Sequence, residues 1–144
     1  MKTNLKWILK SSLFSLFLML LLAGCSKKIA FQNSSVVPAA EGTIAITEDD
    51  NENYKIDLAV KRLADPGRLT PPKSVYVVWI ETSQSGMVNI GQLTTSTKGF
   101  SKMLTSSLSA VSSYKPLKVF ITAEDNAEAN YPSMSVVLET MPIY

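Results

Sequence analysis

Carboxylate side chains gather in two short stretches of the 144-residue sequence, Glu48–Asn53 and Glu124–Asn126. Oxygen ligands of this kind suit Ca²⁺, and a calcium loop of the EF-hand type needs Gly at its sixth position and Glu at its twelfth. Counted from Asp49, those positions hold Tyr54 and Val60. The two stretches also fall on connections expected at opposite ends of an antiparallel fold. We therefore expect solvated loops and no metal site.

Four carboxylates border predicted strands: Asp57, Glu81, Glu124 and Glu139. A glycoside hydrolase would need two of them about 5–10 Å apart across a cleft, but their positions on polar strand faces indicate surface residues. A serine nucleophile would need a buried lysine with a lowered pKa. Lys98 and Lys102, near Ser101, are expected to face solvent. The sequence therefore predicts no catalytic residues.

The composition excludes further classes of chemistry. The chain has no His, which removes catalytic triads and imidazole metal ligands, and its single Cys removes internal disulfides and thiolate zinc sites. The formal charge is +2, and loss of Lys2, Lys6 and Lys10 with the leader described below changes it to −1. Nucleic-acid binding would need a clustered basic surface. We expect no nucleic-acid partner and no cofactor.

The first 24 residues have the pattern of a secretory signal peptide. Three lysines in Met1–Lys10 are followed by an uncharged, apolar stretch, Ser11–Gly24. As a helix this stretch would be about 21 Å long at ~1.5 Å per residue. The hydrocarbon core of a bilayer is about 30 Å thick, so the length is typical of a signal peptide and short for a transmembrane helix.

The signal peptide ends in Leu22-Ala23-Gly24-Cys25, which resembles the lipobox of bacterial lipoprotein precursors. The resemblance implies that a signal peptidase recognises the three residues before Cys25. It also implies that the Cys25 thiol is alkylated by a diacylglycerol donor before cleavage after Gly24. A buried free Cys at the end of an ordinary membrane anchor is the alternative. The expected partner is the membrane, reached through covalent acyl chains such as palmitate.

The residue after the modified cysteine bears on localisation. In enterobacterial-type sorting an Asp at that position retains a lipoprotein in the inner membrane, and this chain has Ser26. We therefore expect a lipid-anchored protein of the bacterial cell envelope, in the outer membrane rather than the inner one.

The rest of the chain divides into a linker and one domain. Residues 25–41, the lipidated Cys and the segment after it, lack sustained periodicity and are expected to form a flexible linker. Its reach would be roughly 20–24 Å. Residues 42–144 alternate short apolar runs with turn-forming residues, which predicts an antiparallel, immunoglobulin-like β-sandwich. The seven expected strands are Thr43–Glu48, Tyr54–Lys61, Ser74–Thr82, Met87–Leu93, Phe100–Leu104, Leu117–Thr122 and Ser135–Thr140.

Two segments also satisfy a helical period. Tyr54–Ala64 places apolar residues at i, i+3, i+4 and i+7, and Ser101–Ser113 also places four apolar residues at helical spacing. We favour a strand for the first, because a loop precedes it and Asp65-Pro66-Gly67 ends it. The serines at 101, 106, 107, 109 and 112 weaken a helix in the second. The predicted core residues are Ile44, Ile46, Ile56, Leu58, Val60, Val77, Trp79, Leu93, Val119, Ile121 and Val137.

Two blocks of the domain resemble a known family. Tyr76–Ile80 and Asn89–Leu93 are similar to the Tyr-x-x-Trp and x-x-Gly-x-Leu motifs in the extracytoplasmic C-terminal domain of anti-sigma-K-type factors. Phe120–Glu124 and Tyr131-Pro132 resemble a later strand of that domain and its following loop. The family's Gly-Gly loop is replaced by Asp125–Glu128. The resemblance implies a β-sandwich fold; control of a sigma factor is not implied, because the sigma-binding region has no counterpart.

These patterns predict a non-enzymatic envelope lipoprotein whose domain serves protein interaction or assembly. The alternatives are a binding or sensor module for a glycan or small molecule and, third, an envelope enzyme. A free edge strand or flat apolar patch would favour the first, and a concave pocket with convergent polar groups the second. Four tyrosines at loops or ends could form a stacking platform for a sugar or protein: Tyr54, Tyr114, Tyr131 and Tyr144.

Overall fold

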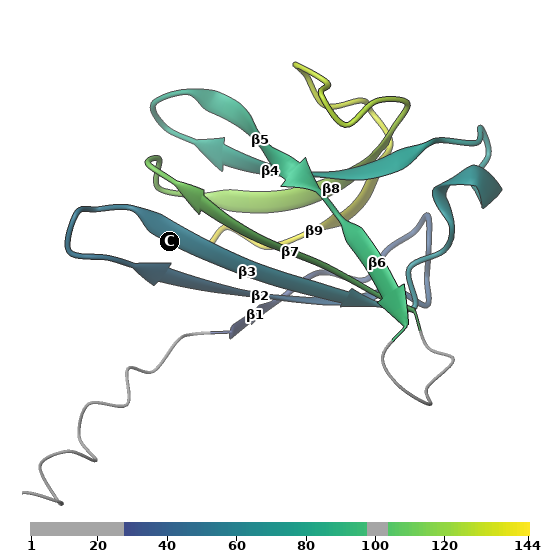
Figure 1. The fold of residues 1–144 in the computed structure, drawn as a ribbon, viewed down its shortest axis with the longest axis horizontal. Coiled ribbons are helices and arrows are strands. Elements are labelled where there is room, and N and C mark those ends of the chain that lie inside the picture. The colour runs from purple at the N-terminus through teal and green to yellow at the C-terminus, as the bar shows by residue number, and fades with distance from the viewer. Residues whose placement is uncertain (1–27, 98–103) are drawn as a thin grey trace, which may run out of the picture.

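The computed structural model describes residues 28–97 and 104–144 (Figure 1). Within these ranges the chain forms nine β-strands and no α-helix, which confirms the all-β prediction. A single 3₁₀ turn follows β3 at Pro66–Arg68. The strands are β1 (Lys28–Ala30), β2 (Glu41–Glu48), β3 (Tyr54–Lys61), β4 (Val75–Thr82), β5 (Gly86–Gln92), β6 (Thr94–Thr97), β7 (Leu104–Ser112), β8 (Lys118–Glu124) and β9 (Val136–Glu139).

The strands form two antiparallel sheets that lie as layers on each other (Figure 1). The first sheet has the order β1-β2-β3-β7-β6 and the second has the order β5-β4-β8-β9. The chain crosses from the second sheet to the first at Leu93, between β5 and β6. Just before this crossing Gly91 has a φ of +125°, a backbone conformation that residues with a Cβ rarely adopt.

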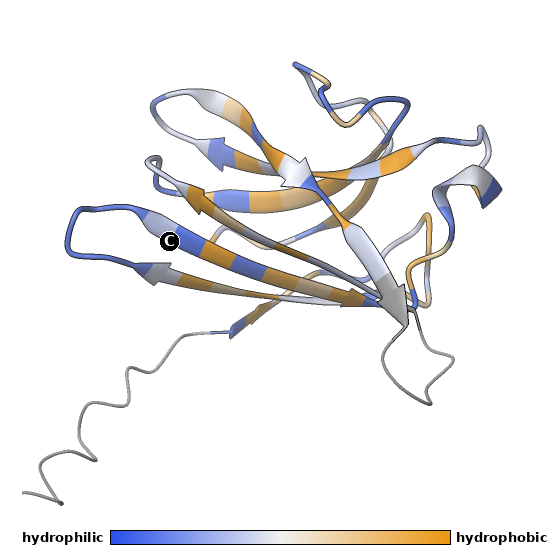
Figure 2. Cartoon of the chain, in the orientation of Figure 1, coloured by the Kyte–Doolittle hydropathy of each residue, from blue (hydrophilic) through white to orange (hydrophobic). Residues whose placement is uncertain are grey.

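The alternation of side chains explains why Tyr54–Lys61 is a strand. Its even-numbered residues are buried and its charged residues are exposed, as the stripes along β3 show (Figure 2). A helix would place Lys55 and Asp57 beside buried neighbours, whereas a strand turns both to solvent. The helical alternatives are therefore wrong for Tyr54–Lys61 and for Leu104–Ser112, which is β7. The part of the second alternative before Leu104 lies outside the described residues.

The main core fills the space between the sheets, and most of the predicted core residues lie in it. Seven of them are buried there: Ile44, Ile56, Leu58, Val60, Val119, Ile121 and Val137. Ile46 and Leu93 are partly buried against it. Val77 and Trp79 are fully buried too, but they form a second cluster with Phe120 on the outer face of the second sheet. The prediction that these two residues are buried is confirmed.

Residues 28–41 belong to the folded domain, so the expected flexible linker is wrong over this range. β1 pairs with β2, Phe31 bridges to Thr140, and Val37 and Ala40 are buried. The segment shows no regular alternation of apolar and polar residues because it pairs with each sheet over only a few residues. It pairs first with β2 at the edge of the first sheet and then runs beside β9 at the edge of the second. The Phe31 ring packs on Gly42, where a side chain would collide with it, so the small residue at position 42 is consistent with a folded segment before β2.

Candidate functional site

The predicted lipid attachment site lies just outside the described residues. Cys25 and its recognition residues Leu22, Ala23 and Gly24 precede Lys28, the first residue of β1, which is exposed. Three peptide units connect Cys25 to Lys28, and a fully extended chain of that length spans at most about 11 Å. An anchor at Cys25 would therefore hold the folded domain close to its membrane.

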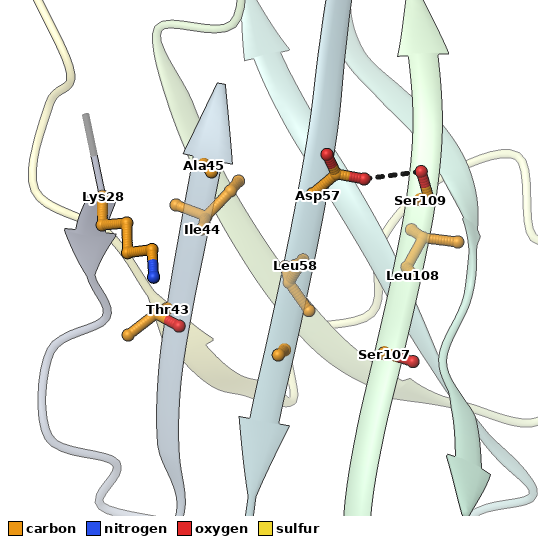
Figure 3. A pocket seen from close by; sticks show the side chains of 10 residues that line it. Lys28, Thr43, Ile44, Ala45, Asp57, Leu58, Ser107, Leu108 and Ser109 are labelled. Carbon is orange, nitrogen blue, oxygen red and sulfur yellow. Dashed lines mark hydrogen bonds between the residues drawn. The ribbon is translucent and has the colours of Figure 1, made fainter. Parts of the chain in front are cut away.

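A shallow hollow of about 380 Å³ crosses the outer face of the first sheet (Figure 3). Register places two rows of side chains there, one with Lys28, Ala45, Asp57 and Ser109 and the other with Thr43, Ala59 and Ser107. Most of these side chains are small, so the sheet surface lies open between them. Several polar groups therefore line this hollow on an open face of the sheet.

Asp57 is the charged centre of this hollow. Its Oδ1 accepts a hydrogen bond of 2.6 Å from Ser109 Oγ, and its Oδ2 lies 3.0 Å from Lys55 Nζ. The hydrogen bond from Ser109 and the contact with Lys55 lower the pKa of Asp57 below its ordinary value. Both carboxylate oxygens of Asp57 therefore have a partner within the protein. Lys28 lines the same hollow from β1.

A second polar group of residues is buried on the outer face of the second sheet. The Trp79 indole donates to Thr122 Oγ1 (2.8 Å), and the Thr122 hydroxyl donates to Glu124 Oε1 (2.5 Å). Glu124 Oε1 also accepts the backbone N–H of Ser133 (2.8 Å). Because Ser133 belongs to the connection between β8 and β9, this chain of bonds fixes that connection over Trp79.

Asn89 holds the same connection from the other side. Its Nδ2 donates to the carbonyls of Ala127 (2.9 Å) and Ala129 (3.1 Å), and its Oδ1 accepts from Gly91 N–H (2.9 Å). The register between β4 and β5 shifts at this point. The sequence signal for this contact is an Asn two residues before a Gly within a predicted strand. The family resemblance covers Asn89 but does not indicate this contact.

The four predicted carboxylates do not form a facing pair. Asp57 lies on the first sheet and Glu124 is buried under the β8–β9 connection. Glu81 is the register neighbour of Lys118, and Lys118 Nζ lies 2.5 Å from Glu139 Oε2. Among the described residues, no buried side-chain nitrogen or oxygen lacks a hydrogen-bond partner. Lys98, Ser101 and Lys102 lie outside the described residues.

The acidic loop between β2 and β3 uses its oxygens internally. Asp49 Oδ1 accepts the backbone N–H groups of Asn51 and Asn53, and Asp49 Oδ2 accepts Asn53 Nδ2. The bonds from Asn53 are the main cause of the lowered pKa of Asp49. Glu124 is the last residue of β8, and the connection that follows β8 lies at the opposite end of the sandwich from the β2–β3 loop (Figure 1). Residues 28–97 and 104–144 contain no group of three or more acidic residues placed to hold a metal ion.

The four tyrosines separate into one group and one outlier. Tyr54 is buried, and burial together with Glu48 raises its pKa. Tyr144 is exposed, and Lys115 Nζ lies 4.0 Å from the centre of its ring. Tyr114 is at the same end of the sandwich, where its N–H donates to Ser112. Tyr131 lies in the β8–β9 connection at the other end, so the four do not form one platform.

Two sheet edges carry exposed apolar side chains. β5 ends the second sheet on one side and exposes Met87. β9 ends it on the other, next to a groove of about 370 Å³ between Val136–Glu139 and Gln32–Ser35. Only the C-terminal end of β9 is covered there, where Gln32 N–H donates to the Glu139 carbonyl (2.8 Å). Neither edge could be predicted from local sequence patterns, because strand order depends on long-range pairing.

Comparisons with known proteins add no family to this description. No family model, no curated protein and no solved structure matches the chain. The similarity to anti-sigma-K-type domains therefore stays a sequence-based expectation. No helix within the described ranges is both long enough and apolar enough to span a bilayer.

Proposed function

We propose that the protein is a non-catalytic lipoprotein of the bacterial cell envelope, anchored through Cys25 and serving protein interaction or assembly. The observation that carries the proposal is the position of the only cysteine of the chain. Cys25 follows Leu22-Ala23-Gly24 at the end of a signal-like apolar segment and stands three residues before the first strand. Ser26 favours the outer membrane. Two or three acyl chains would make the attachment effectively permanent, because each buried methylene contributes about 0.8 kcal/mol.

The proposed domain is an immunoglobulin-like sandwich, and the strand order supports this. In that fold the first, second, fifth and fourth strands form one sheet, and the third, sixth and seventh form the other. If β2 is taken as the first strand and β5 as the extra strand that variable-type domains add beside the third, the orders β2-β3-β7-β6 and β4-β8-β9 correspond to these two sheets. Trp79 departs from the pattern, since it packs outside the sandwich on Phe120 and not between the sheets.

The edge of β5 is the proposed surface for a protein partner. An edge strand presents unpaired N–H and C=O groups to which an extended segment of another protein can add. From Gly86 to Asn89 the strand pairs regularly with β4, and the register shift comes only after Asn89. Met87 supplies an exposed apolar side chain on this segment. β5 and β9 are the two opposite edges of the second sheet.

The state of the carboxylates supports a non-catalytic role. Asp57, Glu124 and Glu139 each already interact with a hydroxyl, an ammonium or a backbone N–H group. A general acid–base pair needs two carboxyl groups directed at one substrate bond. These three lie on different strands with their own partners, and none is directed at another.

Site-specific photo-cross-linking in intact cells tests the proposed interaction. A photoreactive amino acid at Met87 should give a discrete adduct with one envelope protein, whereas the same group at Ser109, on the first sheet, should give none. Equal adducts from both positions would show non-specific collision. Protein adducts from Ser109 alone would contradict the proposed role of the β5 edge.

A binding module for a glycan or small molecule is the second candidate, and the hollow of Figure 3 favours it. Lys28, Asp57 and Ser109 offer donors and acceptors on one open face. Hydroxyl-rich ligands are recognised by groups of this kind. The test is ligand-induced stabilisation of the lipoprotein by an oligosaccharide mixture, compared with Asp57→Asn. Stabilisation that Asp57→Asn removes would favour this candidate over the first.

A further inference from the structure

We infer that the side of the domain formed by β1 and β9 lies on the surface of the membrane that holds the anchor. This inference rests on the proposed lipid attachment at Cys25. We call this side the β1–β9 seam, defined as Lys28–Val36 and Met134–Met141. The occupant is the phospholipid surface itself.

The length of the connection brings the membrane to this side. Lys28 is the third residue after Cys25, so the membrane surface lies within about 11 Å of the start of β1. β1 is the edge strand of the first sheet, and the chain after it runs beside β9, with Phe31 bridged to Thr140 and Gln32 Nε2 in contact with Met141 Sδ. The far edges of the two sheets, β6 and β5, lie on the other side of the domain from this connection.

The β1–β9 seam carries the side chains that suit an interface with lipid. Four of its apolar residues are exposed, and Met134 is completely so: Val36, Met134, Val136 and Met141. Val136 lines the groove between β9 and Gln32–Ser35, and Val36 directly follows the second of these segments in the sequence. Apolar side chains of this kind gain by entering the headgroup region, and the exposed Lys28 at the start of the seam suits anionic lipid.

The other surfaces within reach of the anchor suit the membrane less. The loop between β2 and β3 is near the start of β1 but exposes four carboxylates, which an anionic surface repels: Glu48, Asp49, Asp50 and Glu52. The outer face of the first sheet has small and hydroxyl side chains around Thr43 and Ser107 and no large apolar group beside β1. The seam therefore starts at Lys28, next to the anchor, and presents apolar side chains along its length as far as Met134 at its other end.

A single introduced cysteine tests the orientation. Cys25 is the only cysteine and would carry the lipid, so a new cysteine is the only free thiol for a polarity-sensitive fluorophore. The acylated protein is placed in vesicles of phosphatidylethanolamine and phosphatidylglycerol that contain a quencher-bearing lipid. Met134→Cys is compared with Met87→Cys on β5, Thr43→Cys on the outer face and Asp50→Cys in the acidic loop.

Quenching at Met134→Cys should exceed that at each of the three other positions by at least about twofold. Equal quenching at all positions, or a maximum at any other one, would overturn the orientation. In the unaltered lipoprotein on the same vesicles, Met134 should be oxidised by peroxide more slowly than Met87, although Met134 is the more exposed of the two. Faster oxidation of Met134 would contradict the inference without any substitution.

The mass of the N-terminal peptide distinguishes failure of the proposed lipid anchor from failure of the proposed orientation. If Cys25 carries acyl chains and Met134 is not preferentially quenched, the orientation is wrong and the anchor stands. If Cys25 carries no acyl chain, both the proposed function and the orientation fail.

Discussion

The indole N–H of Trp79 donates a 2.8 Å hydrogen bond to the hydroxyl of Thr122, its neighbour on β8 on the outer face of the second sheet. Both side chains are fully buried, although they lie outside the space between the sheets. The domain thus has two apolar clusters, and the second exists only because the β8–β9 connection covers it.

Removal of the Trp79 ring should therefore destabilise the domain as a core mutation does. Trp79→Ala should lower the free energy of unfolding by about 3–5 kcal/mol, because a cavity replaces the ring beneath the connection. Trp79→Phe should cost about 1–2 kcal/mol, mainly through the lost donor. Urea unfolding followed by circular dichroism measures both. Met87→Ala, on the exposed β5 edge, is the control; a Trp79→Ala effect no larger than the control would disprove the second cluster.

Gly42 and Phe31 test whether the segment before β2 is part of the fold. A Cβ at position 42 would lie 2.7 Å from Phe31 Cδ2, so Gly42→Ala should reduce the free energy of unfolding by about 1–3 kcal/mol. In a Phe31→Leu background the same change should cost less, because the ring that it strikes is gone. Additive effects in this double-mutant cycle would mean that the ring does not pack on residue 42.

Asp57 should make stability pH-dependent in a defined direction. Its folded pKa lies below the ordinary value of 3.8, so its contribution is present above that pH and is lost as the pH falls through the folded pKa. Ser109→Ala should therefore be less stable than the parent at neutral pH, by less than about 1 kcal/mol because the pair is exposed. The difference should fade below pH 3.8. Ser107→Ala, on the same face, is the control; an equal pH-dependence in both variants would refute the role of Ser109.

A chelator should leave the melting temperature of the lipoprotein unchanged. The Asp49 carboxylate accepts hydrogen bonds from its own loop at both oxygens, which leaves the loop closed without a cation. Differential scanning fluorimetry with and without EDTA, and with added Ca²⁺, makes the measurement. A clear fall with EDTA that Ca²⁺ reverses would show that the acidic loop is a metal site.

Local patterns in the sequence predicted most of the strands but not their edges. β3 matches its prediction at both ends because period-two alternation and a clear loop act together there. β1 and β6 were missed, since three- and four-residue strands are too short to show a period. β7 was missed because its buried face includes Ser106 and Ser112 while Val111 is exposed, which hides the alternation of apolar residues. The predicted strand Phe100–Leu104 lies outside the described residues except for Leu104, which begins β7. The expected flexible linker failed because its burial depends on residues distant in the sequence. Phe31 is partly buried and bridges to Thr140, and Val37 and Ala40 are buried in the main core, which no local pattern reports.

The candidate site was less predictable than the fold. Asp57 was recognised as a polar-face residue, but its hydrogen bond to Ser109 joins residues 52 positions apart. Trp79 was predicted to be buried, yet nothing local shows that it faces away from the main core. That direction follows from the β8–β9 connection, whose path depends on Asn89 and Glu124.

The most direct test of the account is the intact mass of the mature protein purified from bacterial membranes. We predict a mature chain that begins at Cys25 and carries a diacylglyceryl group. The Cys25→Ser variant should accumulate as uncleaved precursor without acyl label. A mature protein that is soluble and free of lipid, or a Cys25→Ser variant that is processed and labelled normally, would contradict it.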